Sequence, residues 1–195
     1  ESLAAACILL SNWRFKEPFY DPFCGSGTFA IEALMIARNI APGLKRRFAF
    51  ENLQLVDWET CENERALARS KRFEWEYDIF ASDIDADMVK IAESNAARAW
   101  QEGRIQFSIK DFKQMVEDEK FTGTIITNPP YDLRLKDANI DTLYRNIDKL
   151  FRLNPELKGW VISWYAEFDN LIKLSDYKKR KLYNGGELCY LYRRK

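Results

Sequence analysis

The sequence predicts an α/β fold in which a mostly parallel, seven-stranded sheet carries helices on both faces and ends in an antiparallel hairpin. Two observations support this prediction. Short apolar segments typical of strands alternate with longer segments of helical spacing, as in sheets built from strand–helix–strand units. The last two apolar segments instead flank the turn Asn184-Gly185-Gly186, which favours a hairpin of two adjacent strands.

Each element is expected from its local pattern. Strands are predicted at 19–21, 79–83, 105–109, 124–127, 160–164, 180–183 and 188–192. Helices are predicted where apolar residues recur three or four positions apart, at 1–10, 29–40, 60–75, 87–100 and 140–153. Pro42-Gly43 should end the second helix, and Asp85 should cap the start of the fourth.

The composition limits the classes of function. The chain has 195 residues, of which 47% are hydrophobic, and this suits one domain with a sizeable core. Its 30 basic and 30 acidic residues cancel, so nucleic-acid binding would need a local basic patch. It contains no histidine, which excludes histidine bases, histidine metal ligands and Ser-His-Asp triads.

Cysteine usage and hydropathy indicate where the protein works. The 4 cysteines are widely spaced and form no CxxC pair, which favours reduced thiols over disulfides or a zinc site. There is no secretory signal and no apolar run of about 18 residues. We therefore expect a cytoplasmic protein that binds neither a membrane nor a metal. Because the chain begins at Glu1 without an initiator methionine, we also expect a domain of a longer protein.

A glycine turn, Gly25-Ser26-Gly27, follows the first expected strand and leads into a helix. Ligands of open parallel sheets bind beyond the carboxyl ends of the strands. Glycines allow the backbone to approach such a ligand closely. The spacing is neither the GxGxxG of dinucleotide-binding folds nor a P-loop. We interpret it as the turn that holds a nucleoside cofactor, and an ordinary strand–helix turn is the alternative.

Two further strand ends carry acidic residues. Asp83 ends the strand 79–83, where a carboxylate can accept hydrogen bonds from both hydroxyls of a ribose. A helix cap is the alternative role for Asp83. Asp111 and Phe112 follow the strand 105–109, where the carboxylate could accept from an adenine amino group and the phenyl ring could cover the base. This pair carries little information by itself, because many strands end in Asp.

The segment Asn128-Pro129-Pro130-Tyr131 follows the strand 124–127 and is the most specific signal in the chain. The prolines fix the backbone, and the Pro129 carbonyl and the Asn128 side-chain oxygen can accept the two hydrogens of an exocyclic amine. The nitrogen lone pair would then face an electrophile. Tyr131 offers a flat face for stacking a base, a contact worth about 1–3 kcal/mol. A proline-rich junction between strand and loop is the alternative.

Together, DPFCGSGT at 21–28, SDID at 82–85 and NPPY at 128–131 resemble the class I S-adenosylmethionine-dependent methyltransferases, which have a Rossmann-like fold. More narrowly, the segments 1–6, 41–44 and 178–183 are similar to bacterial RNA methylases that are paired with a THUMP domain. That group includes the 23S rRNA guanine-N2 methyltransferases. The resemblance covers nearly the whole chain, and it treats 44–78 as an insertion that the family shares.

The resemblance implies a role for each motif. The cofactor S-adenosylmethionine would be bound by Asp21, Cys24, Gly25, Ser26, Gly27, Thr28, Asp83, Ile84, Asp111 and Phe112. The target base would be bound by Asn128, Pro129, Pro130 and Tyr131. Asp132 stands where the family often has Gly, whereas Arg134 keeps its place. The family pattern also implies an upstream THUMP domain that binds RNA.

The expected function is methylation of an exocyclic amino group in RNA, namely guanine N2 of 23S rRNA. Arg134 and Lys136 follow the target-binding segment and are the best candidates for phosphate contacts. Methylation of adenine N6 in RNA or DNA is an alternative, because the same tetrapeptide serves both amines. Methylation of a protein glutamine amide and a non-catalytic module for RNA binding or ribosome assembly are further alternatives.

Overall fold

The structure is a computed structural model of the whole chain. It describes residues 1–53, 57–99, 103–118, 120–130, 137–165, 167–172 and 176–194. Within these ranges, the side chains of 118 and 137–139 are left out of the description. In the same part of the chain, no helix is both long and apolar enough to cross a membrane.

Seven strands form one sheet in the order β3-β2-β1-β4-β5-β7-β6, which confirms the predicted fold class. Their bounds are β1 Phe19–Asp21, β2 Ile79–Asp83, β3 Gln106–Ile109, β4 Thr124–Thr127, β5 Lys158–Ser163, β6 Tyr177–Asn184 and β7 Glu187–Arg194. The first five strands run parallel, and β7 lies antiparallel between β5 and β6. The C-terminal hairpin was predicted, although its strands are longer than expected.

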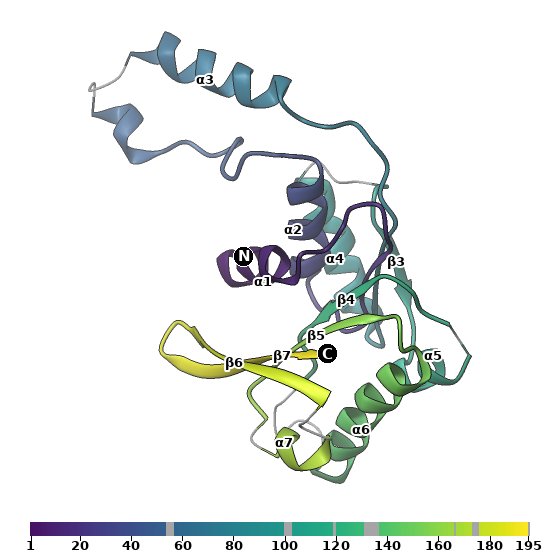
Figure 1. Cartoon of the computed structure of the whole chain (residues 1–195). Helices are drawn as coiled ribbons and strands as arrows, with labels where there is room; N and C mark the ends of the chain where they lie inside the picture. The colour runs from purple at the N-terminus through teal and green to yellow at the C-terminus, as the bar shows by residue number, and fades with distance from the viewer. Residues whose placement is uncertain are drawn as a thin grey trace.

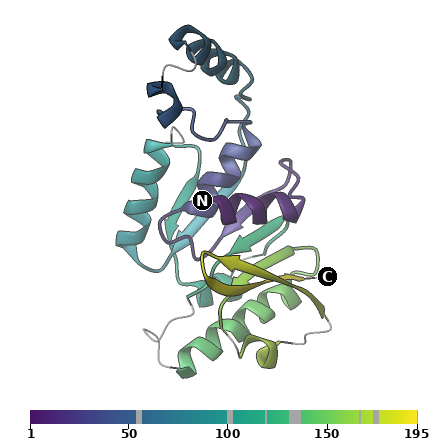
Figure 2. The same ribbon diagram turned by 90° about the vertical axis from the view of Figure 1, so that its left-hand side faces the viewer.

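Helices cover both faces of this sheet (Figures 1 and 2). One face carries α1 Ser2–Ser11, α2 Thr28–Ala37 and α4 Ala86–Arg98. The other face carries α5 Phe112–Asp118, α6 Asp137–Leu153 and α7 Phe168–Leu171. The sequence did not predict α5 and α7, since helices of seven and four residues are too short to show a clear period.

The strands separate two hydrophobic clusters because successive side chains point to opposite faces. Ile126 packs with α1, α2 and α4, whereas its neighbour Ile125 packs with α5, α6 and α7. Ile162 and Val161 divide in the same way on β5. A β-carbon at Gly159 would overlap the ring of Phe151, so this glycine lets α6 lie directly on β5. The central strands are therefore buried on both faces, as in other parallel sheets.

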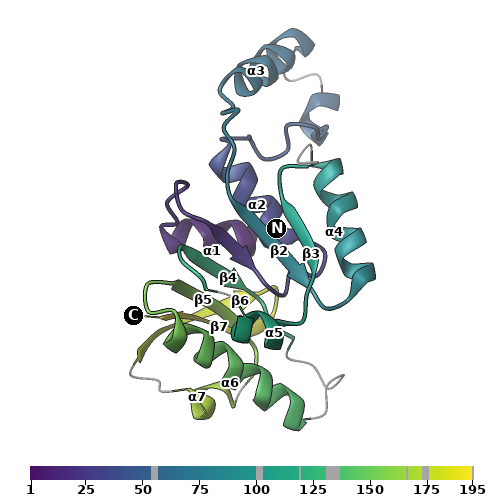
Figure 3. The ribbon, with the colours of Figure 1, turned by 90° about the vertical axis from the view of Figure 1, so that its right-hand side faces the viewer.

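The segment 41–78, here called the arm, projects from the body of the molecule (Figure 1). It contains the 3-10 helix η1 Ala49–Asn52 and the helix α3 Trp58–Ser70. The predicted helix at 60–75 was therefore placed too far along the chain, since α3 ends five residues earlier. The arm leaves the carboxyl end of α2 and returns at the start of β2. It consequently lies at the end of the sheet opposite to the carboxyl ends of the parallel strands (Figure 3).

Candidate active site

A cavity of about 910 Å³ opens beyond the carboxyl ends of β1, β2, β3 and β4. This is where open parallel sheets bind their ligands. The described residues that line it are Pro22, Phe23, Gly25, Asp83, Ile84, Asp85, Met88, Lys110, Asp111, Phe112, Lys113, Asn128, Pro129, Pro130, Thr142, Leu143 and Asn146. The structure thus brings residues from the glycine turn, the two acidic strand ends and the NPPY segment to one cavity.

The glycine turn between β1 and α2 needs both of its glycines. Gly25 and Gly27 have φ angles of 50° and 84°, which side chains with a β-carbon rarely adopt. A β-carbon at Gly27 would also come within 3.0 Å of the β-carbon of Ala92 on α4. At Gly25 an added β-carbon would meet nothing within 4 Å, because this glycine faces the cavity. The amide of Asn95 on α4 fixes the turn by donating to the Ser26 carbonyl at 2.9 Å.

Asp83 at the end of β2 is joined to this turn. The Gly25 N–H donates to Asp83 Oδ2 at 2.9 Å, and the Asp85 N–H donates to Asp83 Oδ1 at 3.0 Å. The helix cap is Asp85, as predicted, since its Oδ1 accepts from the N–H groups of Asp87 and Met88 at 2.8 and 3.4 Å. Asp83 is thus held beside the glycine turn. Its neighbour Ile84 is 68% exposed at the cavity wall, an unusual position for an apolar side chain.

Asp21 lies behind the cavity wall, where it links β1 to β4. Its Oδ1 accepts from the Thr127 hydroxyl at 2.7 Å, whereas its Oδ2 is buried without a hydrogen-bond partner in the described part of the chain. Burial raises the pKa of this carboxyl to about 7, and the charge of Asp83 adds to the rise, whereas the bonds from Thr127 and the Phe23 backbone oppose it. Asp21 can therefore change its protonation near neutral pH.

The other predicted cofactor residues occupy different positions. Cys24 is buried in the core beside the turn, and burial raises the pKa of its thiol, so it is a packing residue and not a thiolate in this structure. Ser26, Gly27 and Thr28 belong to the turn but are not among the residues that line the cavity. Asp111 lines the cavity and accepts from the Lys113 N–H at 2.8 Å, as in a helix cap.

Phe112 lines the cavity from the start of α5 but is only 5% exposed. Its ring packs against Phe23, with the ring centroids 4.6 Å apart. The predicted adenine contact would therefore have to use the small part of this ring that faces the cavity.

The segment after β4 supplies the opposite wall. Asn128, buried Pro129 and exposed Pro130 all line the cavity. Asn128 Oδ1 is buried and, among the described residues, accepts no hydrogen bond. A buried acceptor in this state costs roughly 1–3 kcal/mol, so a donor from outside the protein would find it available. The predicted residues Tyr131, Arg134 and Lys136 lie outside the described residues.

Sequence reasoning missed the residues that α6 contributes. Thr142 and Asn146 are four positions apart and line the cavity from the same face of this helix. A polar pair at that spacing in the first helix after NPPY is the signal that could have found them. Lys110 and Lys113 also line the cavity and give it basic side chains beside Asp111. Within the described ranges, no cluster of three or more His, Cys, Asp or Glu side chains could hold a metal ion.

The fold and the cavity together define a class of protein. A mostly parallel sheet with an antiparallel β7, a glycine turn after β1, an acidic end to β2 and Asn-Pro-Pro after β4 is the arrangement of a class I methyltransferase. The chain belongs to the family described as RMKL-like methyltransferase domain, whose model matches residues 1–193. Membership in this family supports S-adenosylmethionine as the cofactor of the cavity.

Individual relatives agree with this assignment. The chain is 37% identical over 187 residues to "Putative RNA methyltransferase YpsC" of Bacillus subtilis, covering 95% of the chain and 48% of that protein. It is 37% identical over 201 residues to "Ribosomal RNA large subunit methyltransferase K/L" of Psychromonas ingrahamii, covering 98% of the chain and 26% of that protein.

A solved structure is similar over the same length. SMU.472, "a putative methyltransferase complexed with SAH", superposes with a TM-score of 0.90 at 38% identity, covering 98% of this chain and 51% of that one. The chain therefore spans about half the length of YpsC and SMU.472 and about a quarter of the K/L protein.

Proposed function

We propose that this domain transfers a methyl group from S-adenosylmethionine to the exocyclic amine of an RNA base, namely guanine N2 of 23S rRNA. The observation that carries the proposal is that Gly25 of the glycine turn, Asp83 and Asn128 line one cavity. The first two are suited to a nucleoside cofactor, and Asn128 is suited to an amine. Transfer between two bound molecules requires both in a single cavity, with the reacting atoms held in line.

The cofactor fits the residues of the glycine-turn side. Asp83 presents a carboxylate for the ribose hydroxyls, and Gly25 leaves open space in front of the backbone. Ile84 and Phe112 offer apolar surface for the adenine ring, and Asp111 offers an acceptor for its amino group. Asp21 would act from behind the turn by adding negative charge near the methionine ammonium group.

The methyl-accepting side would act by positioning the target amine and by stabilising its charge with two dipoles. When bound, S-adenosylmethionine supplies a methyl group that is already electrophilic. Asn128 Oδ1 and the Pro129 carbonyl accept the two hydrogens of the target amine, which directs its lone pair away from them. The amine would become partly positive as it gains the methyl group and would release a proton to solvent after the transfer. The two oxygens would stabilise the developing charge as preorganised dipoles. Tyr131 would supply the aromatic ring that stacks on the base. The absence of histidine is no obstacle, because no base must remove a proton before attack.

The names of the relatives support RNA as the substrate, since they are an RNA methyltransferase and a large-subunit rRNA methyltransferase. Arg134 and Lys136 would contact phosphates next to the target base. Most of the RNA affinity would come from an upstream THUMP domain in the cytoplasmic full-length protein. The extra length of the relatives leaves room for such a domain.

The test is nucleoside mass spectrometry of rRNA from cells that lack the gene. Loss of one N2-methylguanosine, restored by the wild-type gene and not by a gene carrying Asn128→Ala, is the expected result. Loss of an N6-methyladenosine would support methylation of an exocyclic amine but would show that the target base is adenine and not guanine. An unaltered set of modified nucleosides would contradict the proposal. It would favour a methylated protein or a non-catalytic role in ribosome assembly.

A further inference from the structure

The arm 41–78 exposes more apolar surface than a free surface segment requires. Trp75 is 71% exposed and Leu53 is 62% exposed, and five more large apolar side chains of the arm are exposed, namely Phe48, Phe50, Trp58, Leu67 and Phe73. The 13 residues of α3 include none that is buried. A helix of this length is marginal in water unless one face packs against something. Together these features mark the arm as a surface that binds a protein.

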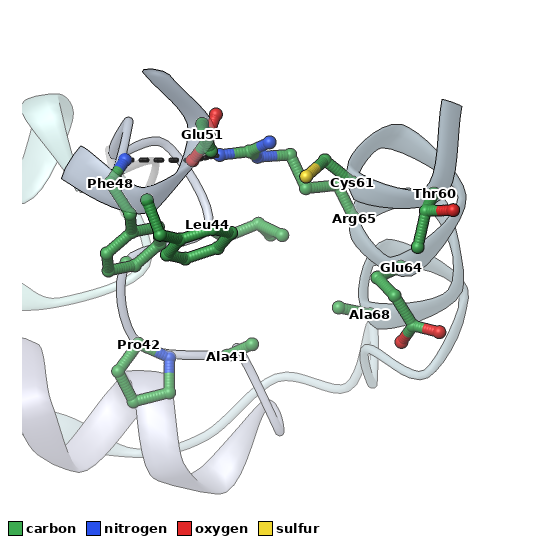
Figure 4. Close-up of a pocket in the computed structure, with 12 residues that line it drawn as sticks. Ala41, Pro42, Leu44, Phe48, Glu51, Thr60, Cys61, Glu64, Arg65 and Ala68 are labelled. Carbon is green, nitrogen blue, oxygen red and sulfur yellow. Dashed lines mark hydrogen bonds and ion pairs between the residues drawn. The ribbon is translucent and has the colours of Figure 1, made fainter. Parts of the chain in front are cut away.

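The arm also contains a preformed apolar groove of about 350 Å³ (Figure 4). Pro42 and Leu44 lie at one wall, and Cys61 and Ala68 of α3 face them. Arg65 of α3 joins the two sides of the groove: its Nη2 lies 2.7 Å from Glu51 Oε1, and the same nitrogen donates to the Arg46 carbonyl at 2.9 Å. A further hydrogen bond holds the start of η1, in which the Phe48 N–H donates to Glu51 Oε1 at 2.8 Å. The groove therefore exists before any partner arrives.

The charge and the place of the arm argue against RNA as its partner. The segment 41–78 holds seven basic and eight acidic residues, so it offers no net attraction to phosphates. It also projects from the end of the sheet opposite to the carboxyl ends of the parallel strands, where the cavity lies (Figure 3). A protein surface is the better match for an electroneutral, aromatic-rich segment.

The distribution of charge along α3 favours a second copy of the same chain as the protein that binds the arm. The acidic residues lie at its start and in its first half, and the basic residues lie in its second half and just beyond, in the order Asp57, Glu59, Glu62, Glu64, Arg65, Arg69, Lys71 and Arg72. Among the described residues, Glu59, Glu64, Arg69 and Lys71 form no ion pair. Two copies of α3 lying antiparallel would place the acidic half of each opposite the basic half of the other. A twofold axis produces this pairing twice.

We propose that the chain forms a twofold homodimer through the arm. In this dimer α3 lies antiparallel to α3 of a second copy, and the exposed aromatic side chains of each arm cover the groove of the other. The two cavities remain open at the outer ends of the dimer, because the arm and the cavity lie at opposite ends of each sheet. The proposal does not depend on the methylation reaction.

Charge reversal tests the proposal with two complementary variants of the whole chain. The first combines Glu59→Lys with Glu64→Lys, which makes α3 basic along its length. The second combines Arg69→Glu with Lys71→Glu, which makes it acidic. These four side chains are exposed, so their exchange should not disturb folding, and thermal unfolding checks this. Sedimentation equilibrium then measures the mass of the wild type, of each variant and of their equimolar mixture.

The wild type should be a dimer, and each variant alone should dissociate at least tenfold more readily. The mixture should recover the dimer mass, because the basic helix of one variant meets the acidic helix of the other. A wild type that stays monomeric at about 100 μM would overturn the proposal, since a specific dimer should be populated there. Variants that dimerise as well as the wild type would also overturn it. A mixture that fails to recover the dimer would overturn the antiparallel pairing.

Discussion

The two sides of the cavity differ in how far their polar atoms are already paired. On the glycine-turn side, both oxygens of Asp83 accept backbone N–H groups at 2.9 and 3.0 Å. On the β4 side, Asn128 Oδ1 is buried with no partner among the described residues. An unpaired buried acceptor costs stability, and such costs gather at functional sites. In the proposed reaction, Asp83 would thus be held in place before the cofactor binds, whereas Asn128 Oδ1 would gain a partner only when the substrate amine binds.

The largest expected effect comes from removing the unpaired acceptor. Asn128→Ala should lower the rate of methyl transfer about 100- to 1000-fold, the usual effect of deleting one preorganised dipole. Cofactor affinity should not change, because Asn128 acts on the opposite wall. Incorporation of labelled methyl groups measures the rate, and calorimetric titration measures the affinity. A loss of affinity equal to the loss of rate would show that the two sides are not separate.

The matched control on the other side is Asn95→Ala. Here the same chemical change removes the amide that holds the Ser26 carbonyl at 2.9 Å. It should weaken cofactor binding and leave the rate at saturating cofactor nearly unchanged. A lower rate at saturating cofactor with unchanged cofactor affinity would show that Asn95 acts on the methyl-accepting side and not on the cofactor side.

A pair of glycine substitutions tests the cofactor side. Gly25 and Gly185 have φ angles of 50° and 62°, and an added β-carbon meets nothing within 4 Å at either position. Gly25→Ala and Gly185→Ala should each cost about 1–2 kcal/mol of stability, measured by denaturant unfolding. Only Gly25→Ala should also weaken cofactor binding, by about tenfold. Equal affinities in the two variants would mean that the backbone at Gly25 does not approach the cofactor.

The Asp83 carboxylate should contribute about as much to cofactor affinity as Gly25 does. Asp83→Asn keeps the size of the side chain but removes its charge and turns one of its two acceptors into an NH2 donor. It should weaken cofactor binding about tenfold. Asp87→Asn is the matched control, because Asp87 is an exposed carboxylate on α4 that is not among the residues lining the cavity. Calorimetric titration measures the cofactor affinity of both variants. Unchanged affinity in Asp83→Asn would remove this carboxylate from the cofactor site.

A further expected effect is a pH dependence of folding stability due to Asp21. Burial raises its pKa from 3.8 to about 7, so between these values the folded chain holds a proton that the unfolded chain has released. Asp21 therefore favours folding at low pH, and this contribution is lost as the pH rises from about 4 to 7. Its slope is at most about 1.4 kcal/mol per pH unit.

Denaturant unfolding of the wild type and Asp21→Asn across this range isolates the contribution of Asp21. The difference in unfolding free energy between the two proteins should change with pH and level off above about 7. A difference that does not depend on pH would show that Asp21 has an ordinary pKa.

The sequence predicted the elements that position the site because their signals are local. The strands 19–21, 79–83 and 124–127 have the predicted bounds, since each is a short apolar run that ends at a polar residue or a turn. The cap at Asp85 was predicted for the same reason. These segments carry the glycine turn, Asp83 and Asn128 to a common edge, so the meeting of the motifs followed from topology alone.

The remaining features depend on tertiary packing. Nothing local shows that Thr142 and Asn146 face the cavity, because that depends on how α6 lies on the sheet. The sequence predicted that the Phe112 ring would cover a base. In the structure, Phe112 lies at the start of α5, and most of its ring is buried against Phe23. The arm was recognised as an insertion, yet its projection from the body was not foreseen.

In the proposed reaction, the unpaired Asn128 Oδ1 at the end of β4 selects an NH2 group. The most direct test identifies the methylated atom. The full-length protein is incubated with labelled S-adenosylmethionine and unmodified 23S rRNA, and the labelled nucleoside is identified by mass spectrometry against standards. N2-methylguanosine is the expected labelled product, with at most a trace of label when Asn128→Ala replaces the wild type. A label on a ring nitrogen, a ring carbon or a ribose hydroxyl would contradict it.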